Sequence, residues 1–326
     1  MLSQVDLFAV TVIVVNWNGR RCLPRCLNAL QQQTFSDFRV LIMDNGSTDG
    51  SGELVGALKD NRFTLMSLGS NLGFARANNL GVEQAGGSKW VALLNPDAFP
   101  APDWLERLLA AAEQCSAGAA FGSQLLSAEN PDLVDGSGDN YHLSGRPFSR
   151  DHGQTYCKNP RSTGEIFSPC AAAALYLRSA WVAVGGMDED YFCYLEDVDL
   201  GFRLRLRGYQ CWFVPEAICH HMGSAITGRR SDFTIYHGQR NLVWTYVKNM
   251  PGVLFWLLLP FHLMLNLVAL VIYFRRGQSR VVWRSKRDAV RGLPSTWRKR
   301  RLVQGVRSVS ALAIWRVLDK SIFQLS

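Results

Sequence analysis

The sequence predicts an α/β fold in which helices flank an open, mostly parallel sheet. One observation is a series of short, continuous apolar segments rich in Val, Ile and Leu, as expected of strands buried on both faces. Segments with helical spacing of leucines separate these strands, which gives the alternating order of a parallel sheet. Polar clusters follow the strands, where the ligands of such sheets bind.

The elements follow in a regular order over the N-terminal third of the chain. Apolar runs predict four strands, at residues 8–16, 38–44, 63–68 and 89–95. Helices are predicted between them, at residues 20–33, directly after the turn 45–51, and at residues 73–86. Leu23, Leu27 and Leu30 give the first of these helices its apolar face.

The pattern then weakens and returns. Residues 124–165 are polar, rich in Gly, Ser and Asp, and predict an irregular excursion over one side of the site. Order resumes at residues 170–177 and in a short strand at 210–215. We therefore assign residues 1–245 to the α/β domain and residues 246–326 to a C-terminal helical segment.

An uncharged apolar run of 22 residues occupies positions 253–274. As one helix it would be about 33 Å long, enough to cross a bilayer. Pro260, His262 and Asn266 interrupt it, and a single span would place the α/β domain and a basic tail on opposite sides. We expect a re-entrant or in-plane insertion, broken near Pro260, with both flanks cytosolic. A buried helical hairpin is the alternative.

The positive charge of the chain is concentrated after this run. Residues 275–301 contain eleven Lys and Arg and one acid, Asp288, which makes this segment +10 in a chain of net charge +8. Trp283, Val290 and Trp297 recur every seven residues among the arginines. An anionic membrane surface therefore fits as a partner. Nucleic acid fits less well because no known nucleic-acid module accompanies the charges.

Several classes of protein are disfavoured by what the sequence lacks. No G-x-G-x-x-G segment and no Walker A loop occur, which argues against a Rossmann dehydrogenase and a P-loop NTPase. The eight cysteines are scattered without a C-x-x-C pair, which indicates a reducing compartment and no disulfide framework.

Three polar clusters follow strand ends: Asn16-Trp17-Asn18, Asp44–Asp49 and Asn95-Pro96-Asp97. Turn formation and helix capping are the structural alternative for each of them. Asp44 and Asp97 each end a strongly apolar strand, so both would be held rigidly at the edge of the sheet. Asp44 could accept hydrogen bonds from a base or ribose, and Asp97 could hold a divalent ion on a diphosphate.

These segments together resemble a known family. The stretches "TVIVVNWNG", "VLIMDNGSTDGS", "NLGFARANNLG", "LLNPDA" and "GGMDEDYFCYLEDVDLGFRLRLRGY" resemble, over about residues 8–225, the family 2 glycosyltransferases. The resemblance is greatest to the bacterial branch typified by rhamnosyltransferases of cell-wall and O-antigen assembly. It implies the GT-A fold, a Rossmann-like mixed sheet flanked by helices, with residues 124–165 on the acceptor side.

The resemblance also implies a donor site. Asp44 takes the place of the Asp that binds the nucleoside, and Asn95-Pro96-Asp97 takes the place of the D-x-D motif, with Asn in place of the first acid. Asp97 is then the main carboxylate ligand of Mg²⁺ or Mn²⁺. The expected nucleotide-sugar-binding residues are Asn16, Asn18, Asp44, Asn45, Ser47, Asn71, Gly73, Phe74, Asn78, Asn95 and Asp97.

The acidic segment supplies the expected catalytic group. Glu196-Asp197 matches the acidic pair that provides the general base of inverting members, typically a factor of about 10²–10⁴ in rate. We predict Asp197 as the base and Glu196 as an orienting residue; the alternative is that both acids only favour a helix N-terminus. Asp199 is expected to pair with Arg203. Asp188, in the place of the family's G-G-F-D-E turn, is expected to shape the acceptor site.

Two adjacent histidines follow the strand at residues 210–215. The family often has a histidine here as a further ligand of the metal or diphosphate, and His220 is predicted to take that role, with His221 second. A purely structural role is the alternative. A zinc site with Cys219 is disfavoured because no second ligand pair has the spacing of a zinc finger.

The sequence therefore predicts a metal-dependent inverting hexosyltransferase. The expected donor is a dTDP- or UDP-sugar, with rhamnose favoured by the branch, and the expected acceptor is lipid-linked or a saccharide. The expected location is the cytoplasmic face of the bacterial inner membrane, held by the C-terminal region. A polyprenyl-phosphate sugar transferase and a non-catalytic nucleotide-binding membrane adaptor are the alternatives.

Overall fold

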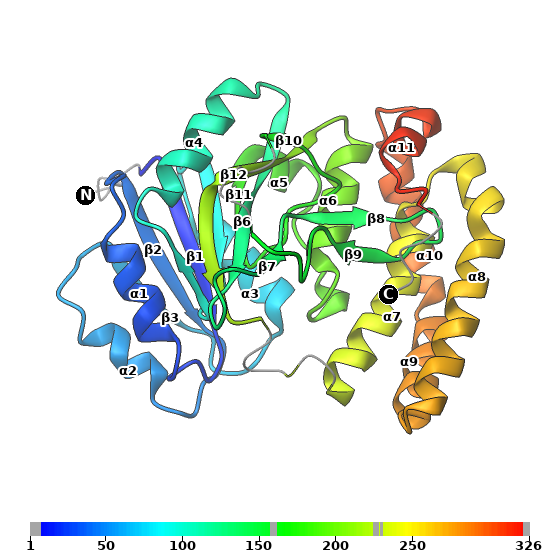
Figure 1. Ribbon diagram of the computed structural model, residues 1–326, viewed down its shortest axis with the longest axis horizontal. Coiled ribbons are helices and arrows are strands. Elements are labelled where there is room, and N and C mark those ends of the chain that lie inside the picture. Colours follow the sequence, from blue (N-terminus) through cyan, green and yellow to red (C-terminus); the bar gives the residue numbers. More distant parts are fainter. Residues whose placement is uncertain (1–7, 157–161, 224–227, 229–230, 322–326) are drawn as a thin grey trace.

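The computed structural model describes residues 8–156, 162–223, 228 and 231–321. A mixed sheet lies between two layers of helices, and further helices pack beside it (Figure 1). The strands are β1 (Val10–Asn16), β2 (Phe38–Asp44), β3 (Phe63–Ser67), β4 (Trp90–Leu94), β5 (Ala98–Pro100), β6 (Gly118–Ser127), β7 (Val134–Gly136), β8 (Asp139–Tyr141), β9 (Pro147–Ser149), β10 (Gly164–Glu165), β11 (Ala173–Leu177) and β12 (Gln210–His221).

Helices connect these strands and then form the C-terminal part of the chain. They are α1 (Leu23–Gln31), α2 (Ser51–Gly56), α3 (Phe74–Gln84), α4 (Trp104–Gln114), α5 (Arg178–Ala183), the 3₁₀ helix η1 (Glu189–Tyr191), α6 (Glu196–Leu206), α7 (Asp232–Asn249), α8 (Gly252–Arg275), α9 (Ser279–Arg291), α10 (Leu293–Gly305) and α11 (Ala311–Val317).

Half of the large sheet has the predicted parallel arrangement. β1 pairs in parallel with both β2 and β4, and β2 pairs in parallel with β3. β1 is buried along its whole length, as its continuous β-branched sequence predicts. The register places Asn16 opposite Asp44, so two of the predicted polar clusters meet at the carboxyl ends of β1 and β2.

The other half of the sheet is mixed. β11 is antiparallel to β4 and β6, whereas β12 is parallel to β6 and antiparallel to β5. β12 extends to His221, beyond the predicted strand at 210–215, and β6 was not predicted as a strand. The predicted excursion at 124–165 contains the short strands β7 to β10.

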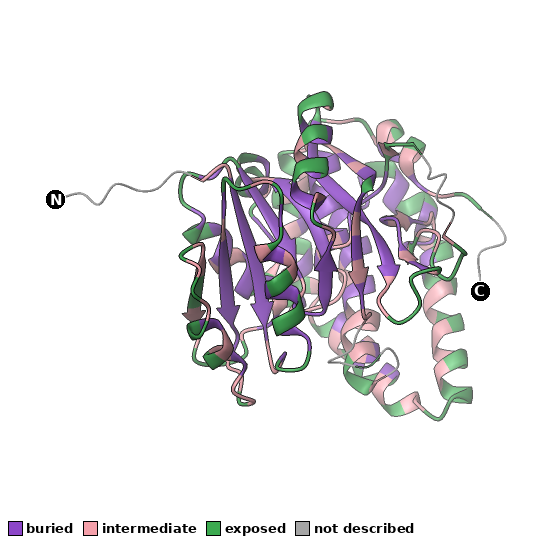
Figure 2. Cartoon of the chain, turned by 60° about the vertical axis from the view of Figure 1, so that its left-hand side comes forward, coloured by how far each residue is buried: buried purple, intermediate pink, exposed green. Residues whose placement is uncertain are grey.

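Two apolar clusters fill the space between sheet and helices. One joins β1 and β2 to α1 and α4, with Trp104 fully buried. The other joins the opposite face of the sheet to α3, α5 and α6. Burial is densest along the sheet (Figure 2). The seven cysteines within the described residues are free thiols, and Cys157 lies outside them.

A third cluster joins the C-terminal helices to the α/β part. It contains Tyr141 of β8, Phe202 of α6, Tyr246 of α7, Phe255 of α8 and Ile314 of α11. α7 runs through the predicted boundary between residues 245 and 246, so the two predicted parts share one packed core.

The apolar run forms one continuous helix, α8. It passes through Pro260 without the predicted break, and only its inner face is buried, so the alternative of a buried hairpin is also wrong. By length and composition, α8 is the one candidate membrane span among the described helices. Its most apolar 18 residues have a mean hydropathy of 2.2, and only 17% of them are buried. Membrane-type helices tolerate proline because neighbouring groups satisfy the freed carbonyl.

Candidate active site

A cavity of about 460 Å³ lies at the carboxyl ends of β1 and β4. Asp97 reaches it from the connection between β4 and β5, and Asp197 from the first turn of α6. Asp139 of β8 and Phe148 of β9 close another side. Residues more than one hundred positions apart therefore meet around one space, which is large enough for a small-molecule ligand.

The first strand end organises the polar loops beside this cavity. The amide of Asn16 donates to Asp44 Oδ1 (3.2 Å), to Ser47 Oγ (3.1 Å) and to Ser51 Oγ (2.8 Å). The backbone N–H of Asn18 donates to the same Ser47 hydroxyl at 3.0 Å. These hydrogen bonds of Asn16, Asn18 and Ser47 fix the shape of the loop. Asp44 does not line the cavity, but its neighbour Asn45 does.

A second polar set holds the loop before α3. The side-chain amide of Asn45 donates to Asn71 Oδ1 (3.0 Å), which also accepts from the N–H of Gly73 (3.0 Å). Asn45, Asn71 and Phe74 line the cavity. Gly73 has a φ of 87°, and a β-carbon there would lie 2.6 Å from the ring of Phe192, so glycine is required.

Asn78 is the one predicted donor-site residue in α3 that has an internal role. Its amide donates to the carbonyl of Phe74 at 2.9 Å, one turn earlier, and the side chain is buried. It does not line the cavity. Its effect on a ligand is therefore through the position of Phe74.

The predicted acidic pair lies at the cavity. Asp197 accepts hydrogen bonds from the backbone N–H groups of Ala171 (3.0 Å) and Val198 (2.8 Å). Burial raises the pKa of Asp197, and these N–H groups offset the rise in part. Burial, and then the charge of Asp197, raises the pKa of the neighbouring Glu196 well above its ordinary value. Asp197 is therefore the acid that ionises more readily.

Asp139 is a fourth cavity-lining carboxyl, beside Asp97, Glu196 and Asp197, and the sequence did not indicate it. Burial, and then the charge of Asp197, raises its pKa well above the ordinary value. Its residue type in the Gly- and Asp-rich stretch 135–139 was the only signal, and that stretch has no periodicity. Among Asp139, Glu196 and Asp197, Asp197 has the most backbone N–H donors, which counter the rise in pKa caused by burial.

The backbone that precedes the acidic pair is strained. Phe192, Tyr194 and Leu195 have φ values of 65°, 67° and 66°, a region that bulky residues rarely adopt. All three line the cavity. Such outliers persist where the surrounding structure holds them, and they cluster at functional sites.

The two adjacent histidines have different surroundings. His221 Nε2 lies 3.4 Å from Asp97 Oδ1, while its Nδ1 lies 2.7 Å from Asp135 Oδ2. Strand alternation directs His220, the residue predicted as the ligand, away from the cavity. The side chain beside Asp97 is therefore that of the second choice, His221. Although burial opposes protonation, Asp135 and Asp97 raise the pKa of His221 to about 9.

This arrangement fits a divalent cation. Asp135 on Nδ1 orients the His221 ring so that Nε2 faces Asp97, and a bound cation would replace the Nε2 proton. Within the described residues no three His, Cys, Asp or Glu side chains gather as a complete metal site. Asp97 and His221 would thus supply two ligands, and the remaining ones would come from a ligand's phosphate oxygens and water.

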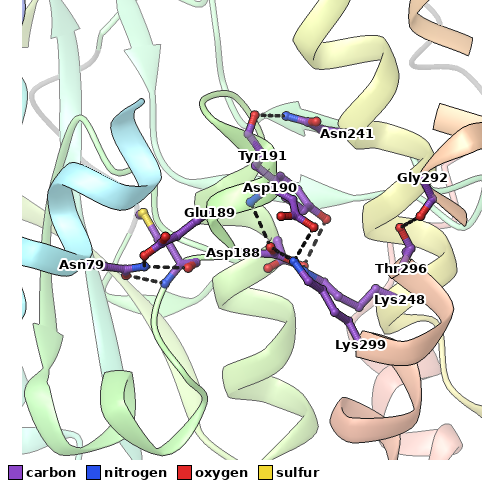
Figure 3. A network of polar contacts seen from close by, with 12 residues as sticks. Asn79, Asp188, Glu189, Asp190, Tyr191, Asn241, Lys248, Gly292, Thr296 and Lys299 are labelled. Atoms are coloured by element: carbon purple, nitrogen blue, oxygen red, sulfur yellow. Dashed lines mark hydrogen bonds and ion pairs between the residues drawn. The ribbon is translucent and has the colours of Figure 1, made fainter. Parts of the chain in front are cut away.

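Asp188 lies outside the cavity and joins the C-terminal helices to the site. Figure 3 shows its carboxylate between the ammonium groups of Lys248 (α7) and Lys299 (α10). Lys248 also lies 2.8 Å from the buried Asp199, which pairs at 2.8 Å with Arg203, as predicted. Lys248 and Lys299 thus hold the turn at Asp188 on the side away from the cavity, so any influence of Asp188 on an acceptor is indirect.

The sequence of the α/β part decides the family. Residues 11–181 match the family model described as Glycosyl transferase family 2. The chain belongs to glycosyltransferase family 2. The matched residues include most of β1, all of β4 and the Asn95-Pro96-Asp97 segment that borders the cavity.

This glycosyltransferase has a mycobacterial rhamnosyltransferase among its relatives. It is 32% identical over 248 residues to the N-acetylglucosaminyl-diphospho-decaprenol L-rhamnosyltransferase of Mycobacterium tuberculosis, a match that covers 67% of this chain and 77% of the relative. Rhamnosyltransferases are thus among the homologues of this chain, as the resemblance predicted.

Solved structures confirm the GT-A fold of this glycosyltransferase. A mannosyltransferase from Pyrobaculum calidifontis, in complex with GDP-Man and Mn²⁺, matches with a TM-score of 0.55 and 18% identity over 95% of this chain and 86% of that one. GalNAc-T7 with UDP, GalNAc and Mn²⁺ matches with a TM-score of 0.61 and 14% identity over 75% of this chain and 48% of that one.

Proposed function

We propose that this glycosyltransferase is a metal-dependent inverting enzyme that transfers a sugar from a nucleoside diphosphate sugar to a lipid-linked saccharide. The observation that carries the proposal is the pairing, around one cavity, of the Asp97–His221 arrangement with the carboxylate of Asp197. Asp97 and His221 suit a diphosphate with its cation. The Asp197 carboxylate suits a hydroxyl that must lose a proton.

The donor is assigned to the side of the cavity formed by β1, β2 and α3. Asn45 and Asn71 face the cavity there, and the Asn16 network supports the loop from Asp44 to Ser51. We assign the nucleoside to Asp44, whose carboxylate can accept hydrogen bonds from a base or ribose. The diphosphate then lies toward Asp97, where a bound Mg²⁺ or Mn²⁺ would neutralise the charge of the departing diphosphate.

The acceptor approaches from the side of Asp197. As the acceptor oxygen bonds to the anomeric carbon, its proton passes to the Asp197 carboxylate, and the bond from that carbon to the phosphate oxygen breaks. Attack opposite to the leaving group inverts the configuration. The N–H groups of Ala171 and Val198 keep the carboxylate aimed at this position before the reaction.

The first test is donor turnover with and without EDTA. We expect metal-dependent release of nucleoside diphosphate in the presence of acceptor, with Mg²⁺ or Mn²⁺ restoring activity after chelation. Nuclear magnetic resonance of the product would show the inverted anomeric configuration. Absence of release from every donor would favour the non-catalytic nucleotide-binding adaptor.

For substrates, the homology to the mycobacterial rhamnosyltransferase supports L-rhamnose, from a dTDP-sugar, as the first donor to test. UDP-glucose, UDP-galactose and GDP-mannose are the comparison donors. For the acceptor we propose a saccharide on a polyprenyl diphosphate, in bacterial surface polysaccharide synthesis. Preference for an unglycosylated polyprenyl phosphate would instead support the polyprenyl-phosphate sugar transferase.

The location we propose is the cytoplasmic face of the bacterial inner membrane. The outer face of α8 exposes large apolar side chains, and the adjoining α9 carries Arg280, Arg284 and Arg287. Apolar insertion and attraction to anionic lipid would act together at such a surface. The donor sugars are cytosolic metabolites, which agrees with this orientation.

A further inference from the structure

A second cavity, of about 850 Å³, lies among helices α7, α8, α9 and α10. It shares no lining residue with the active-site cavity. We call it the C-terminal groove. Its walls are almost entirely apolar, with side chains from all four helices, among them Val243, Phe255, Leu263, Leu267, Val290 and Trp297. A polar metabolite would lose its hydration there without replacement.

Three cations also line this groove: Lys286, Arg298 and Arg301. The ammonium of Lys286 donates to Asn266 Oδ1 (2.5 Å) and to the carbonyl of Gln239 (2.9 Å), both of which are neutral. Burial lowers the pKa of Lys286 to about 7. Across the described part of the chain, none of the ion pairs includes these three side chains, and no carboxylate lines the groove.

The composition of the groove selects its ligand. An apolar volume with unpaired cations complements an amphiphile that has a hydrocarbon chain and a phosphate group. Leu263 and Leu267 line the groove and are also 55% and 56% exposed on the apolar face of α8. A chain could therefore enter laterally from a bilayer without crossing water.

The groove is also within reach of the active site. Phe233, in the first turn of α7, lines the active-site cavity, and Val243 of the same helix lines the groove. Ten residues of helix separate them, or about 15 Å. A diphosphate with one or two sugars can bridge such a distance. On α10, Lys299 contacts Asp188 while its neighbour Arg298 lines the groove.

We propose that the C-terminal groove binds the polyprenyl chain of the acceptor lipid, with Lys286, Arg298 and Arg301 around its diphosphate. This inference rests on the proposed function, in that it assigns the lipid part of the acceptor. It makes these helices a substrate site as well as a membrane anchor.

The test is photo-crosslinking of the full chain in detergent by undecaprenyl diphosphate that carries a diazirine on its chain. We expect labelled peptides that contain groove residues of α8, α9 and α10, and competition by unlabelled undecaprenyl diphosphate but not by phosphatidylglycerol. Lys286→Met should reduce labelling about tenfold, as expected for loss of one charge-assisted hydrogen bond. Arg280→Met, an exposed change on the same helix, is the matched control and should label normally.

Other outcomes would overturn the proposal. Equal competition by phosphatidylglycerol would make the groove a site for ordinary membrane lipid. Labelling spread over the outer face of α8 would exclude a specific site in the groove, if neither Lys286→Met nor the exposed pair Arg298→Gln and Arg301→Gln reduced it. Labelling needs no turnover, so the groove could be confirmed while sugar transfer failed. Conversely, transfer to a polyprenyl-linked acceptor without groove labelling would overturn this inference alone.

Discussion

At the scale of single residues, the active site depends on which of its acids carries charge. Asp197 has two backbone N–H donors, whereas the pKa values of Glu196 and Asp139 are raised further by the Asp197 charge itself. Neighbouring acids with separated pKa values divide into a base and neutral partners. This difference supports Asp197 as the proposed base.

Substitution of Asp197 and Asp139 by Asn should therefore have unequal effects. Asp197→Asn should lower the transfer rate by about 10²–10⁴ while donor affinity is retained, because only the base is lost. Asp139→Asn replaces a carboxyl whose pKa burial raises well above its ordinary value, and should leave most of the activity. Initial rates and calorimetric donor binding would measure both. A similar loss of donor affinity in Asp197→Asn would contradict its role as the base.

The pH dependence of transfer follows from the same burial. Because burial raises the pKa of Asp197, the carboxylate is protonated at a pH where an exposed Asp is still charged. As pH falls, the transfer rate should therefore begin to decline at a pH above the ordinary Asp pKa of about 3.9. A profile of rate against pH at saturating donor would show this limb, and an activity still constant at pH of about 4 would exclude Asp197 as the titrating base.

The paired histidines provide an internal comparison for metal binding. His221→Ala should weaken Mn²⁺ binding, measured by electron paramagnetic resonance with nucleoside diphosphate present, whereas His220→Ala should not. Asp135→Asn should weaken it by about 10–100-fold, because the ring of His221 loses the partner that orients it. Equal effects at positions 220 and 221 would contradict the assignment.

These residues mark the limit of sequence reasoning. The family motifs suggest Asp97 and Asp197 without a structure, because each motif is local, and both line the cavity. The choice between His220 and His221 depends on which face of β12 is turned to the cavity, and one residue of register reverses that choice. Asp139 comes from a stretch without periodicity, and its bridge to Ser168 places it near Ala171, whose N–H donates to Asp197.

At the scale of secondary structure, elements with a clear period could be predicted and the others could not. The strand 38–44 is found as predicted, and β1 and β4 begin or end within two residues of prediction. β6 (Gly118–Ser127) mixes Gly, Ser and Gln with apolar residues, so neither period stands out, although it is buried almost throughout. Its position between β11 and β12 also makes half of the sheet mixed, which no local pattern reveals.

The contacts between elements are tested best at Lys248. This side chain is 2% exposed and lies between Asp188 and Asp199, and so ties α7 to η1 and α6. Lys248→Met removes one of two cations from each of the carboxylates Asp188 and Asp199, which keep Lys299 and Arg203, and should destabilise the fold by about 3 kcal/mol in denaturant unfolding, the lower end for a broken buried pair. Lys299→Met is the matched control: its side chain is 33% exposed and Asp188 keeps Lys248, so a loss of about 1 kcal/mol or less is expected. Equal losses would show that Lys248 does not join these elements.

At the scale of the whole molecule, the α/β part and the C-terminal helices form one structure. The third apolar cluster contains side chains of β8, α6, α7, α8 and α11. The carbonyl of Ser144, in the hairpin whose strands line the active site, lies 2.9 Å from Nδ1 of His262 in α8. In both views the arrowheads of β1 and β2 and the turn between α8 and α9 point to the same end of the molecule (Figures 1 and 2). The active site and the tips of the C-terminal helices therefore share one end.

Membrane attachment should be separable from folding by substitutions on α8. Deletion of residues 250–326 should release the protein from membranes, but it would also expose the third cluster. Leu257 and Met264, 61% and 60% exposed, contact little of the protein, so Leu257→Glu with Met264→Glu should leave the fold intact. Each loses about 1.5–3 kcal/mol of apolar burial in lipid, at least a tenfold change in partition.

Co-sedimentation with vesicles that contain anionic lipid would measure this release. Val182→Glu, at a site 60% exposed on α5, is the control, because it makes the same kind of substitution, with one added carboxylate, outside α8. The doubly substituted protein should remain in the supernatant and still release nucleoside diphosphate with a water-soluble acceptor, since the groove and the active-site cavity have no lining residue at 257 or 264. If it sedimented like the control, the outer face of α8 would not be the membrane contact, and attachment would have to come from the basic side chains of α9 and α10.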